Sequence, residues 1–364
     1  MPTRPLVTRY AQDQALFPDR WHHLGLVLGS ALVLAWPFIA TARWLTVANQ
    51  ALTAIVGSVA LMILTGFAGQ ISLGHAAFLA LGAYTVAVLG QTVHMPFWLC
   101  IPIAGSVSAL VGLAIGPFAL RLRGLYLAIV TLGLGFLVNH VLLSFPDLTG
   151  GAAGISVPIH TWFTAPEGTS SLGDYAGPVS LGPLELSAEA KLYFTFLPLA
   201  VAAARMSANL RRTRTGRAML AVRDSDLAAA ALGVSPARAK VSAFAMSSFL
   251  AGVAGAMFAI QQSYITVEPP FDLSMSVAYI AMIVIGGIGT TYGAVAGALA
   301  YVFLTPLMQV VGRHLPLISE LSSAHQSTLL FSLLVCGFLV FEPLGILGIW
   351  LRIKRYFLAW PFRY

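Results

Sequence analysis

The stretch RMSANLRRTRTGRAMLAVRDSDLAAAALGVSPARAK, Arg205 to Lys240, decides how the rest of this chain is placed. It holds eight of the twenty Lys and Arg residues of a chain that is only 9% charged, and apolar segments long enough to enter a bilayer flank it on both sides. Because charged side chains are costly within lipid, the stretch is expected to lie in water. It therefore predicts a large polar loop between membrane segments.

The middle of this loop carries the capping signals of a short helix. Ser225 is suited to cap a helix that begins at Asp226, continues through four successive alanines and ends at Gly233, the residue type favoured in a left-handed C-cap. Ser235 and Pro236 then supply a second N-cap and a proline at the first position of the next helix. A two-turn helix is not stable alone. It either packs on its own membrane helices or inserts its small-residue face into another protein.

The composition indicates a polytopic membrane protein. The 364 residues are 58% hydrophobic, mean hydropathy is +0.84, and apolar runs of about 20 residues recur along the chain. The net charge of +7 is explained by basic residues on one side of a membrane, and no nucleic-acid partner is expected. Cys100 and Cys336 lie in apolar runs and are interpreted as small buried hydrophobes. No removable signal peptide is expected, because the apolar residues begin only at about Leu24.

Ten hydrophobic runs predict an all-α fold of about ten transmembrane helices. The runs are Leu24–Ala42, Leu45–Leu64, Ile71–Leu89, Pro96–Leu120, Leu125–Phe145, Leu192–Ala204, Val241–Ile260, Met275–Gly289, Val295–Val311 and Ser327–Val340. Several are short or rich in Gly and Pro, so broken or re-entrant helices remain an alternative. The chain is thereby divided into a cytoplasmic N-terminal segment (1–23), a membrane domain (24–341) with an outer loop (146–190) and a cytoplasmic loop (205–240), and a basic tail (342–364).

The basic residues fix the orientation. With both termini in the cytoplasm, seventeen of the twenty Lys and Arg residues fall on the inner side, whereas Arg43, Lys191 and Arg313 remain outside. This asymmetry is what the positive-inside rule requires. The Gly- and Pro-rich outer loop is expected to be irregular, and to cap the membrane domain, dock a partner or act as a passive linker. The tail, which mixes aromatic and basic residues, is expected to lie along the inner membrane surface and contact lipid.

Signatures of catalysis are missing from the sequence. The chain has no phosphate-binding G-x-x-x-x-G-K-[ST] motif, so energy from ATP has to come from another chain. It also lacks H-E-x-x-H, C-x-x-C and G-x-S-x-G, and its eight histidines are dispersed. Neither an enzyme, nor a bound cofactor, nor a metal site is expected.

Two stretches bring glycine and polar residues into the membrane. In GFAGQISLGHAAFLALGAYT, Gly66 to Thr85, the side chains of Gln70, Ser72 and His75 either line a translocation path or hydrogen-bond between helices, and packing is favoured for His75.

The second stretch, GGIGTTYGAVAGA, spans Gly286 to Ala298. Gly289, Gly293 and Gly297 recur every four residues, which favours close helix packing. The alternative is a re-entrant turn at Gly286 to Thr291, including Gly287, that leaves backbone groups facing a water-filled cavity.

Six stretches in order resemble the membrane permease subunits of branched-chain amino-acid ABC importers, the LivM-like group. They are GFAGQISLGHAAFLALGAY, LRLRGLYLAIVTLG, LTGGAAGI, GRAMLAVRDSDLAAAALGVSPARAKVSAFAMSSFLAGVAGAMFA, AMIVIGGIGTTYGAVAGA and FEPLGILGIWLRIKRYF, and they cover most of the chain from Gly66 to Phe357. The resemblance implies a helical permease of the large, type II-like ABC importer architecture.

The resemblance also implies a role for the polar loop as the coupling segment that presses into a cytoplasmic ATPase. The general permease pattern is E-A-A, three residues, then G. Aligned on Gly233, it places Ala228 and Ala229 on the alanines but Leu227 where the acid stands, with Asp226 one position earlier. The flanking Arg217 and Arg223 are expected to meet acidic rims of the ATPase.

The partners implied by the resemblance are two ABC ATPase subunits that use ATP, a second related permease subunit and an extracytoplasmic solute-binding protein, all serving a multi-pass protein of the bacterial inner membrane. Leucine, isoleucine and valine are the expected substrates, with urea, short amides and aromatic acids as alternatives. Three other hypotheses about function remain: a secondary transporter or channel acting alone, a membrane scaffold and a membrane enzyme. The first normally needs ionisable groups within the membrane, which are scarce here.

Overall fold

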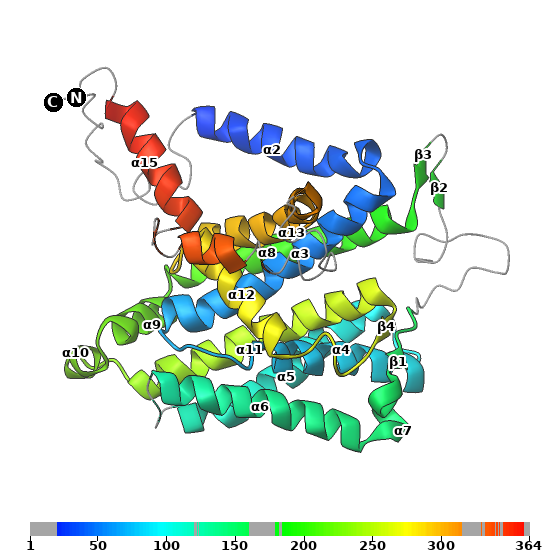
Figure 1. Ribbon diagram of the computed structural model, residues 1–364. Helices are drawn as coiled ribbons and strands as arrows, with labels where there is room; N and C mark the ends of the chain where they lie inside the picture. The colour runs from blue at the N-terminus through cyan, green and yellow to red at the C-terminus, as the bar shows by residue number, and fades with distance from the viewer. Residues whose placement is uncertain are drawn as a thin grey trace.

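The computed structural model describes residues 20–119, 124–159, 179–181, 184–314, 332–338 and 345–359, together with the single positions 122, 329, 340 and 342. Most of these residues form helices, which lie side by side in one elongated bundle (Figure 1). The longer helices are α2 (Arg20–Ile39), α3 (Ala42–Leu61), α4 (His75–Thr92), α5 (Phe97–Ala119), α6 (Leu125–Ser144), α8 (Ala188–Leu210), α11 (Pro236–Gln262), α12 (Leu273–Gly286), α13 (Thr291–His314) and α15 (Gly345–Ala359).

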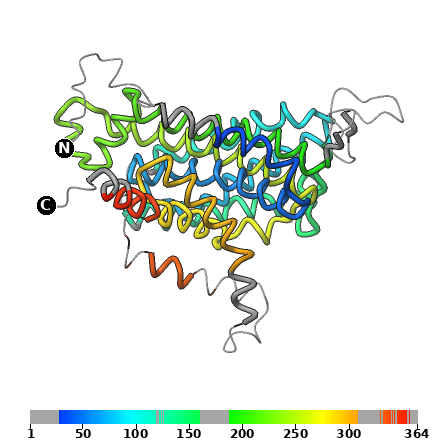
Figure 2. Tube along the Cα trace, turned by 90° about the horizontal axis from the view of Figure 1, so that it is seen from above, coloured from blue at the N-terminus to red at the C-terminus, as the bar shows by residue number. Residues whose placement is uncertain are grey.

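Short elements mark the two ends of the bundle. One end carries α9 (Arg214–Asp224) and α10 (Asp226–Ala231), and α15 extends toward the same end (Figures 1 and 2). The other end carries α7 (Pro146–Thr149), a 3-10 turn (Gly151–Ala153) and two antiparallel strand pairs. The pairs are β1 (Ile155–Ser156) with β4 (Tyr264–Ile265), and β2 (Val179–Leu181) with β3 (Leu184–Leu186).

Helices α3 and α11 form the centre of the bundle, and α11 packs against α3, α4 and α5. Small residues allow this packing. A Cβ atom on Gly82 of α4 would lie 2.1 Å from the Gly252 carbonyl oxygen of α11, and one on Gly255 would lie 1.9 Å from the Leu79 carbonyl oxygen. The two backbones therefore touch, which is how helices associate where no water drives them together.

Four helices in the described part of the chain are long and apolar enough to cross a bilayer, and the bent pair α12–α13 makes a fifth if it counts as one span. The four are Ala42–Phe67, Phe97–Phe118, Tyr126–Ser144 and Pro236–Gln262. The predicted helical membrane architecture is thereby confirmed. The larger figure of about ten crossings stays a prediction, and its last run, Ser327–Val340, is described only at residues 329, 332–338 and 340.

Some predicted boundaries were wrong where the chain breaks a helix. The run predicted from Ile71 becomes helical only at His75, because the backbone from Ala68 to Gly74 is not helical. The run predicted to end at Gly289 stops at Gly286. In the outer loop, residues 160–178, 182 and 183 lie outside the described part, and the described residues include short helical turns and strands in place of wholly irregular chain.

Candidate functional site

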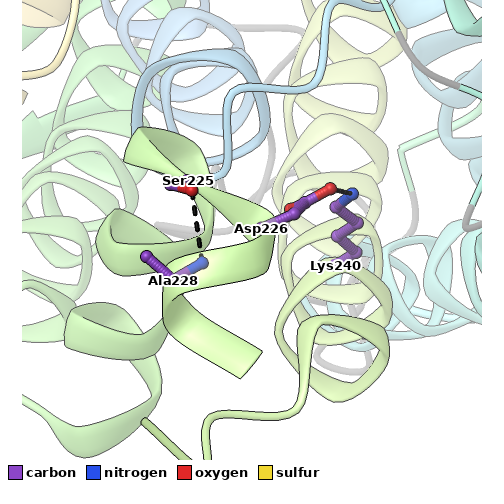
Figure 3. A network of polar contacts seen from close by, with 4 residues as sticks. All are labelled: Ser225, Asp226, Ala228 and Lys240. Atoms are coloured by element: carbon purple, nitrogen blue, oxygen red, sulfur yellow. Dashed lines mark hydrogen bonds and ion pairs between the residues drawn. The ribbon is translucent and has the colours of Figure 1, made fainter. Parts of the chain in front are cut away.

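The capping residues of the polar loop act as predicted. The Ser225 hydroxyl accepts a hydrogen bond from the Ala228 amide at 3.3 Å, and α10 begins at Asp226 (Figure 3). Gly233 has a φ of +81°, in the left-handed region that favours glycine. Ser235 caps α11, and Pro236 occupies its first turn. The turn between α10 and α11 is therefore fixed by local sequence alone.

A partly buried ion pair holds α10 against the bundle. The Lys240 ammonium on α11 donates to the Asp226 carboxylate at 2.7 Å (Figure 3). Within α10, the Ala229 side chain is buried against the bundle, whereas Ala228 is exposed. Asp226 thus holds α10 against α11 of the same chain. This acid stands one position before the place of the acid in the general permease pattern.

The outer surface of α10 carries two large apolar side chains that sequence reasoning missed. Leu227 is 76% exposed and Leu232 is 84% exposed. They flank a patch of exposed alanines, so two large apolar side chains project beside a surface of small side chains. An exposed apolar surface rimmed by charged residues is typical of a protein contact site. The signal was present in the sequence, since the two leucines stand at either side of the four successive alanines.

Helix α9 was not predicted, and it sets the two arginines of the loop in different directions. Met219 and Val222 are buried and anchor one face of α9 on the bundle. Arg217 stays on the exposed side, where its guanidinium donates to the Arg212 carbonyl at 2.8 Å. Arg223 instead reaches toward the membrane helices and donates to the Gly66 carbonyl oxygen. The expectation that Arg217 and Arg223 meet acidic rims of a partner stays a prediction, and both guanidinium groups also have an acceptor within their own chain.

The first helix break, residues 62–74, holds two of the three predicted polar side chains. Helix α3 continues as a π-helical turn (Met62–Phe67), and the chain then runs non-helically to Gly74. Gln70 is 4% exposed, and among the described residues neither its side-chain amide nitrogen nor its amide oxygen has a hydrogen-bond partner. The Ser72 hydroxyl is likewise buried without a partner in the described part of the chain.

His75 follows the packing interpretation. Its Nε2 lies 3.0 Å from the Gly57 carbonyl oxygen, and its ring meets the edge of Tyr279, with ring centroids 5.1 Å apart. The side chain is buried between α3, α4 and α12. It therefore links α4 to α3 and α12.

The second helix break, residues 287–290, shows both of the features considered for its glycines, a turn and close helix packing. The chain bends by 118° between helices α12 and α13. Gly287 and Gly289 have φ values of +114° and +95° in the turn, so the prediction that Gly289 belongs to a helical face was wrong. Gly286 does pack closely, since a Cβ there would lie 1.8 Å from the Gly293 carbonyl oxygen.

Three cavities with polar lining residues lie near the breaks or beside the first turns of α12. One of about 320 Å³, at the α9–α10 end, is lined by Gln70, Arg223 and the start of α10. Two others, of about 200 and 400 Å³, flank the first turns of α12, and both include Asp272. The larger one mixes apolar side chains such as Met275 and Met282 with amides and tyrosines. Within the described residues, no group of three or more His, Cys, Asp or Glu side chains is arranged to hold a metal ion.

Comparison with known proteins assigns a family to this chain. Residues 43–341 match the family described as the permease component of the branched-chain amino acid transport system. The chain is 36% identical over 286 residues to the high-affinity branched-chain amino acid transport system permease protein LivM of Salmonella typhimurium, covering 76% of this chain and 66% of that protein. It is also 36% identical over 294 residues to LivM of Escherichia coli K12, covering 79% and 68%.

A more distant relative is the autoinducer 2 import system permease protein LsrC of an Enterobacter species, which is 33% identical over 218 residues, covering 56% of this chain and 55% of that protein. This chain spans about two thirds of the length of the LivM proteins. No solved structure matches it.

Proposed function

Because this chain belongs to the permease family of branched-chain amino acid transport systems, we propose that it is a membrane subunit of an ATP-driven importer of leucine, isoleucine and valine. The observation that carries the proposal is helix α10, a capped helix held on the bundle by an ion pair, with Leu227 and Leu232 projecting from it. A subunit with no ATP-binding motif needs such a contact to receive energy from another chain.

The proposed partner of α10 is an ABC ATPase subunit, one of two in the complete importer. Leu227 and Leu232 fill its groove, the alanine surface at Ala228 lies against it, and Arg217 meets its acidic rim. Gly233 ends the helix so that the chain returns to the membrane. When ATP closes the ATPase pair, α10 moves, and the membrane helices shift between inward and outward access.

The proposed second permease subunit covers the face that carries both helix breaks. Ile71 and Ile288 are exposed beside non-helical backbone, and Leu273 and Val277 of α12 are exposed as well. Irregular backbone is not stable against lipid, so protein or a water-filled path has to cover this face. That requirement supports a pathway enclosed by two permease subunits, with the solute-binding protein docking at the strand end.

The cavities beside α12 support an amino acid as the substrate. The 400 Å³ cavity offers Phe258, Met275 and Met282 to an aliphatic side chain. Gln261 and Gln262 provide amides, and Asp272 provides a carboxylate suited to an ammonium group. An apolar pocket with a few polar groups is the usual composition of a small-molecule site.

Both termini are proposed to lie in the cytoplasm of a bacterium, with the protein in its inner membrane. The first turns of α2 and the tail helix α15 lie toward the end of the bundle that carries α9 and α10, which supports this orientation (Figure 1).

The test is ATP-dependent uptake of labelled leucine into proteoliposomes containing the complete complex. The variant Leu227→Glu with Leu232→Glu changes only exposed side chains, so this permease should fold with an unchanged melting temperature. Uptake and co-purification of the ATPase subunits should both fall at least about tenfold, since side chains at the centre of an interface contribute most of its affinity. Uptake without ATPase subunits would contradict the proposal in favour of a stand-alone transporter or channel. ATP-dependent uptake of urea, a short amide or an aromatic acid in place of leucine would replace the substrate and keep the mechanism.

A further inference from the structure

Arg223 occupies the last turn of α9, immediately before the residues that begin α10. A basic residue in this position is favourable near the negative end of the helix dipole, and that effect alone requires no particular direction of the side chain. The Arg223 side chain nevertheless turns to the membrane helices, where its Nη1 donates to the Gly66 carbonyl oxygen. The contact joins residues 157 positions apart in the sequence.

The Gly66 carbonyl is an acceptor that the first helix break sets free. In a continuing α-helix it would receive the Gln70 amide, but that amide donates to the Leu64 carbonyl oxygen. The Arg223 guanidinium takes the place of this donor. A hydrogen bond from a charged group to a carbonyl is stronger than one between neutral groups. Arg223 therefore stabilises the broken form of the helix.

The same side chain also lies against the second break. A Cβ on Gly69 would lie 3.1 Å from Arg223 Cγ, and one on Gly289 would lie 2.9 Å from Arg223 Nη1. The stem of Arg223 thus passes over the first break, and its charged head lies beside the second. Both glycines leave the room that this side chain occupies. The breaks themselves touch nearby, where the Gly289 amide lies 3.1 Å from the Met62 sulfur.

We propose that Arg223 is a positioning residue that connects helix α10 to both helix breaks, so that a movement of α10 changes the inner end of the translocation path. This role rests on the proposed function and assigns Arg223 to internal coupling, whereas ATPase docking belongs to α10. Arg223 borders the 320 Å³ cavity and remains more than a third exposed, so its guanidinium has room to release and regain its contacts. The planar group matters, because Lys offers a point charge in place of a fork of donors.

The first test measures the link without relying on transport. In a Cys336→Ser background, Ile71→Cys introduces an accessible thiol in the first break, while Cys100 is buried. Adding Arg223→Gln should speed labelling of this thiol by a water-soluble maleimide about tenfold, because the charged hydrogen bond that holds the break is lost. Arg205→Gln removes an exposed guanidinium from α8 and should leave labelling unchanged. Equal labelling in both variants would overturn the link, whatever the protein transports.

The second test uses the complete complex in proteoliposomes. Arg223→Gln should retain its ATPase subunits and hydrolyse ATP, yet import at least about tenfold less labelled leucine per ATP than wild type, and Arg223→Lys should fall between the two. Loss of the ATPase subunits from Arg223→Gln would make Arg223 a docking residue and overturn the assignment. A wild-type complex without ATP-dependent uptake would instead contradict the proposed function, and the labelling result would still decide whether Arg223 holds the break.

Discussion

The two helix breaks lie next to each other but are built in opposite ways. The break at residues 62–74 is a π-helical turn followed by a non-helical segment, and its buried Gln70 and Ser72 side chains have no hydrogen-bond partner within the described ranges. The break at residues 287–290 is a tight turn between two helices whose glycines touch backbone to backbone. One region is short of hydrogen bonds, whereas the other is closely packed.

The difference indicates which region changes during transport. Buried polar groups are nearly always hydrogen-bonded, so those that lack a partner call for a functional explanation. The first break holds such groups beside a cavity that Arg223 also lines. A packed glycine contact leaves little room for adjustment, because protein interiors are as dense as crystals. We therefore expect the first break to move and the second to act as a fixed bend.

The largest effect is expected where the fixed bend is forced apart. In Gly297→Leu, the new Cβ would lie 1.8 Å from the Met282 carbonyl oxygen, and backbone cannot yield as a flexible side chain does. Destabilisation of at least about 3 kcal/mol is expected, at the upper end of overpacking costs. It is measured as the loss of folded protein in a detergent unfolding titration. Gly133→Leu is the matched control, since nothing lies within 4 Å of a Cβ there, and it should unfold as wild type does. Equal stability of the two variants would show that the glycine contact is not rigid.

A substitution in the first break is expected to stabilise the protein, in contrast to Gly297→Leu in the second region. Gln70→Met removes two buried polar atoms without partners and keeps the length of the side chain. Stability should rise by about 1 to 3 kcal/mol, the usual cost of burying an unpaired polar group, whereas ATP-dependent leucine uptake should fall about tenfold if the amide is needed in another state of the cycle.

A matched variant on the same span separates this effect from a general gain in hydrophobicity. Ser58→Ala removes a buried hydroxyl that donates to the Ala294 carbonyl oxygen at 3.1 Å, so the chain should lose about 1 kcal/mol. If Gln70→Met is also destabilised, the Gln70 amide has partners that hold the break closed, and the contrast between the two breaks disappears.

Sequence reasoning predicted the parts of the site that depend on neighbours in the chain. Ser225, Gly233 and Ser235 cap their helices because capping uses groups within one turn. The break near Gly66 was allowed by its glycines, and packing was the interpretation favoured for His75, whose Nε2 lies 3.0 Å from the Gly57 carbonyl oxygen. These features follow from local rules, so they do not require the fold to be known.

The remaining features depend on contacts between distant segments. Nothing in the residues around Arg223 shows that Gly66 and Gly289 lie within its reach, and the charge-rich sequence around it indicated a surface that faces outward. Gly289 was assigned to a helix because glycines spaced by four fit a helical face, but the positive φ values of Gly287 and Gly289 belong to a turn. The periodicity of glycine cannot distinguish a packed face from a turn followed by one.

The smallest effect is expected at a hydrogen bond that anchors the second break to α8. The hydroxyls of Ser207 and Thr291 lie 2.9 Å apart, and both side chains are buried. Ser207→Ala or Thr291→Val alone should cost about 1 kcal/mol, since each leaves the other hydroxyl without its partner, whereas the double variant should cost less than the sum of the two. A thermal unfolding series of the four proteins measures this coupling. Leucine uptake per folded complex should stay at the wild-type level in all of them, because this hydrogen bond holds the second break, which is expected not to move. Lower uptake at unchanged stability would show that the second break also moves, and Thr291 would then belong with Gln70 among the residues that move during transport.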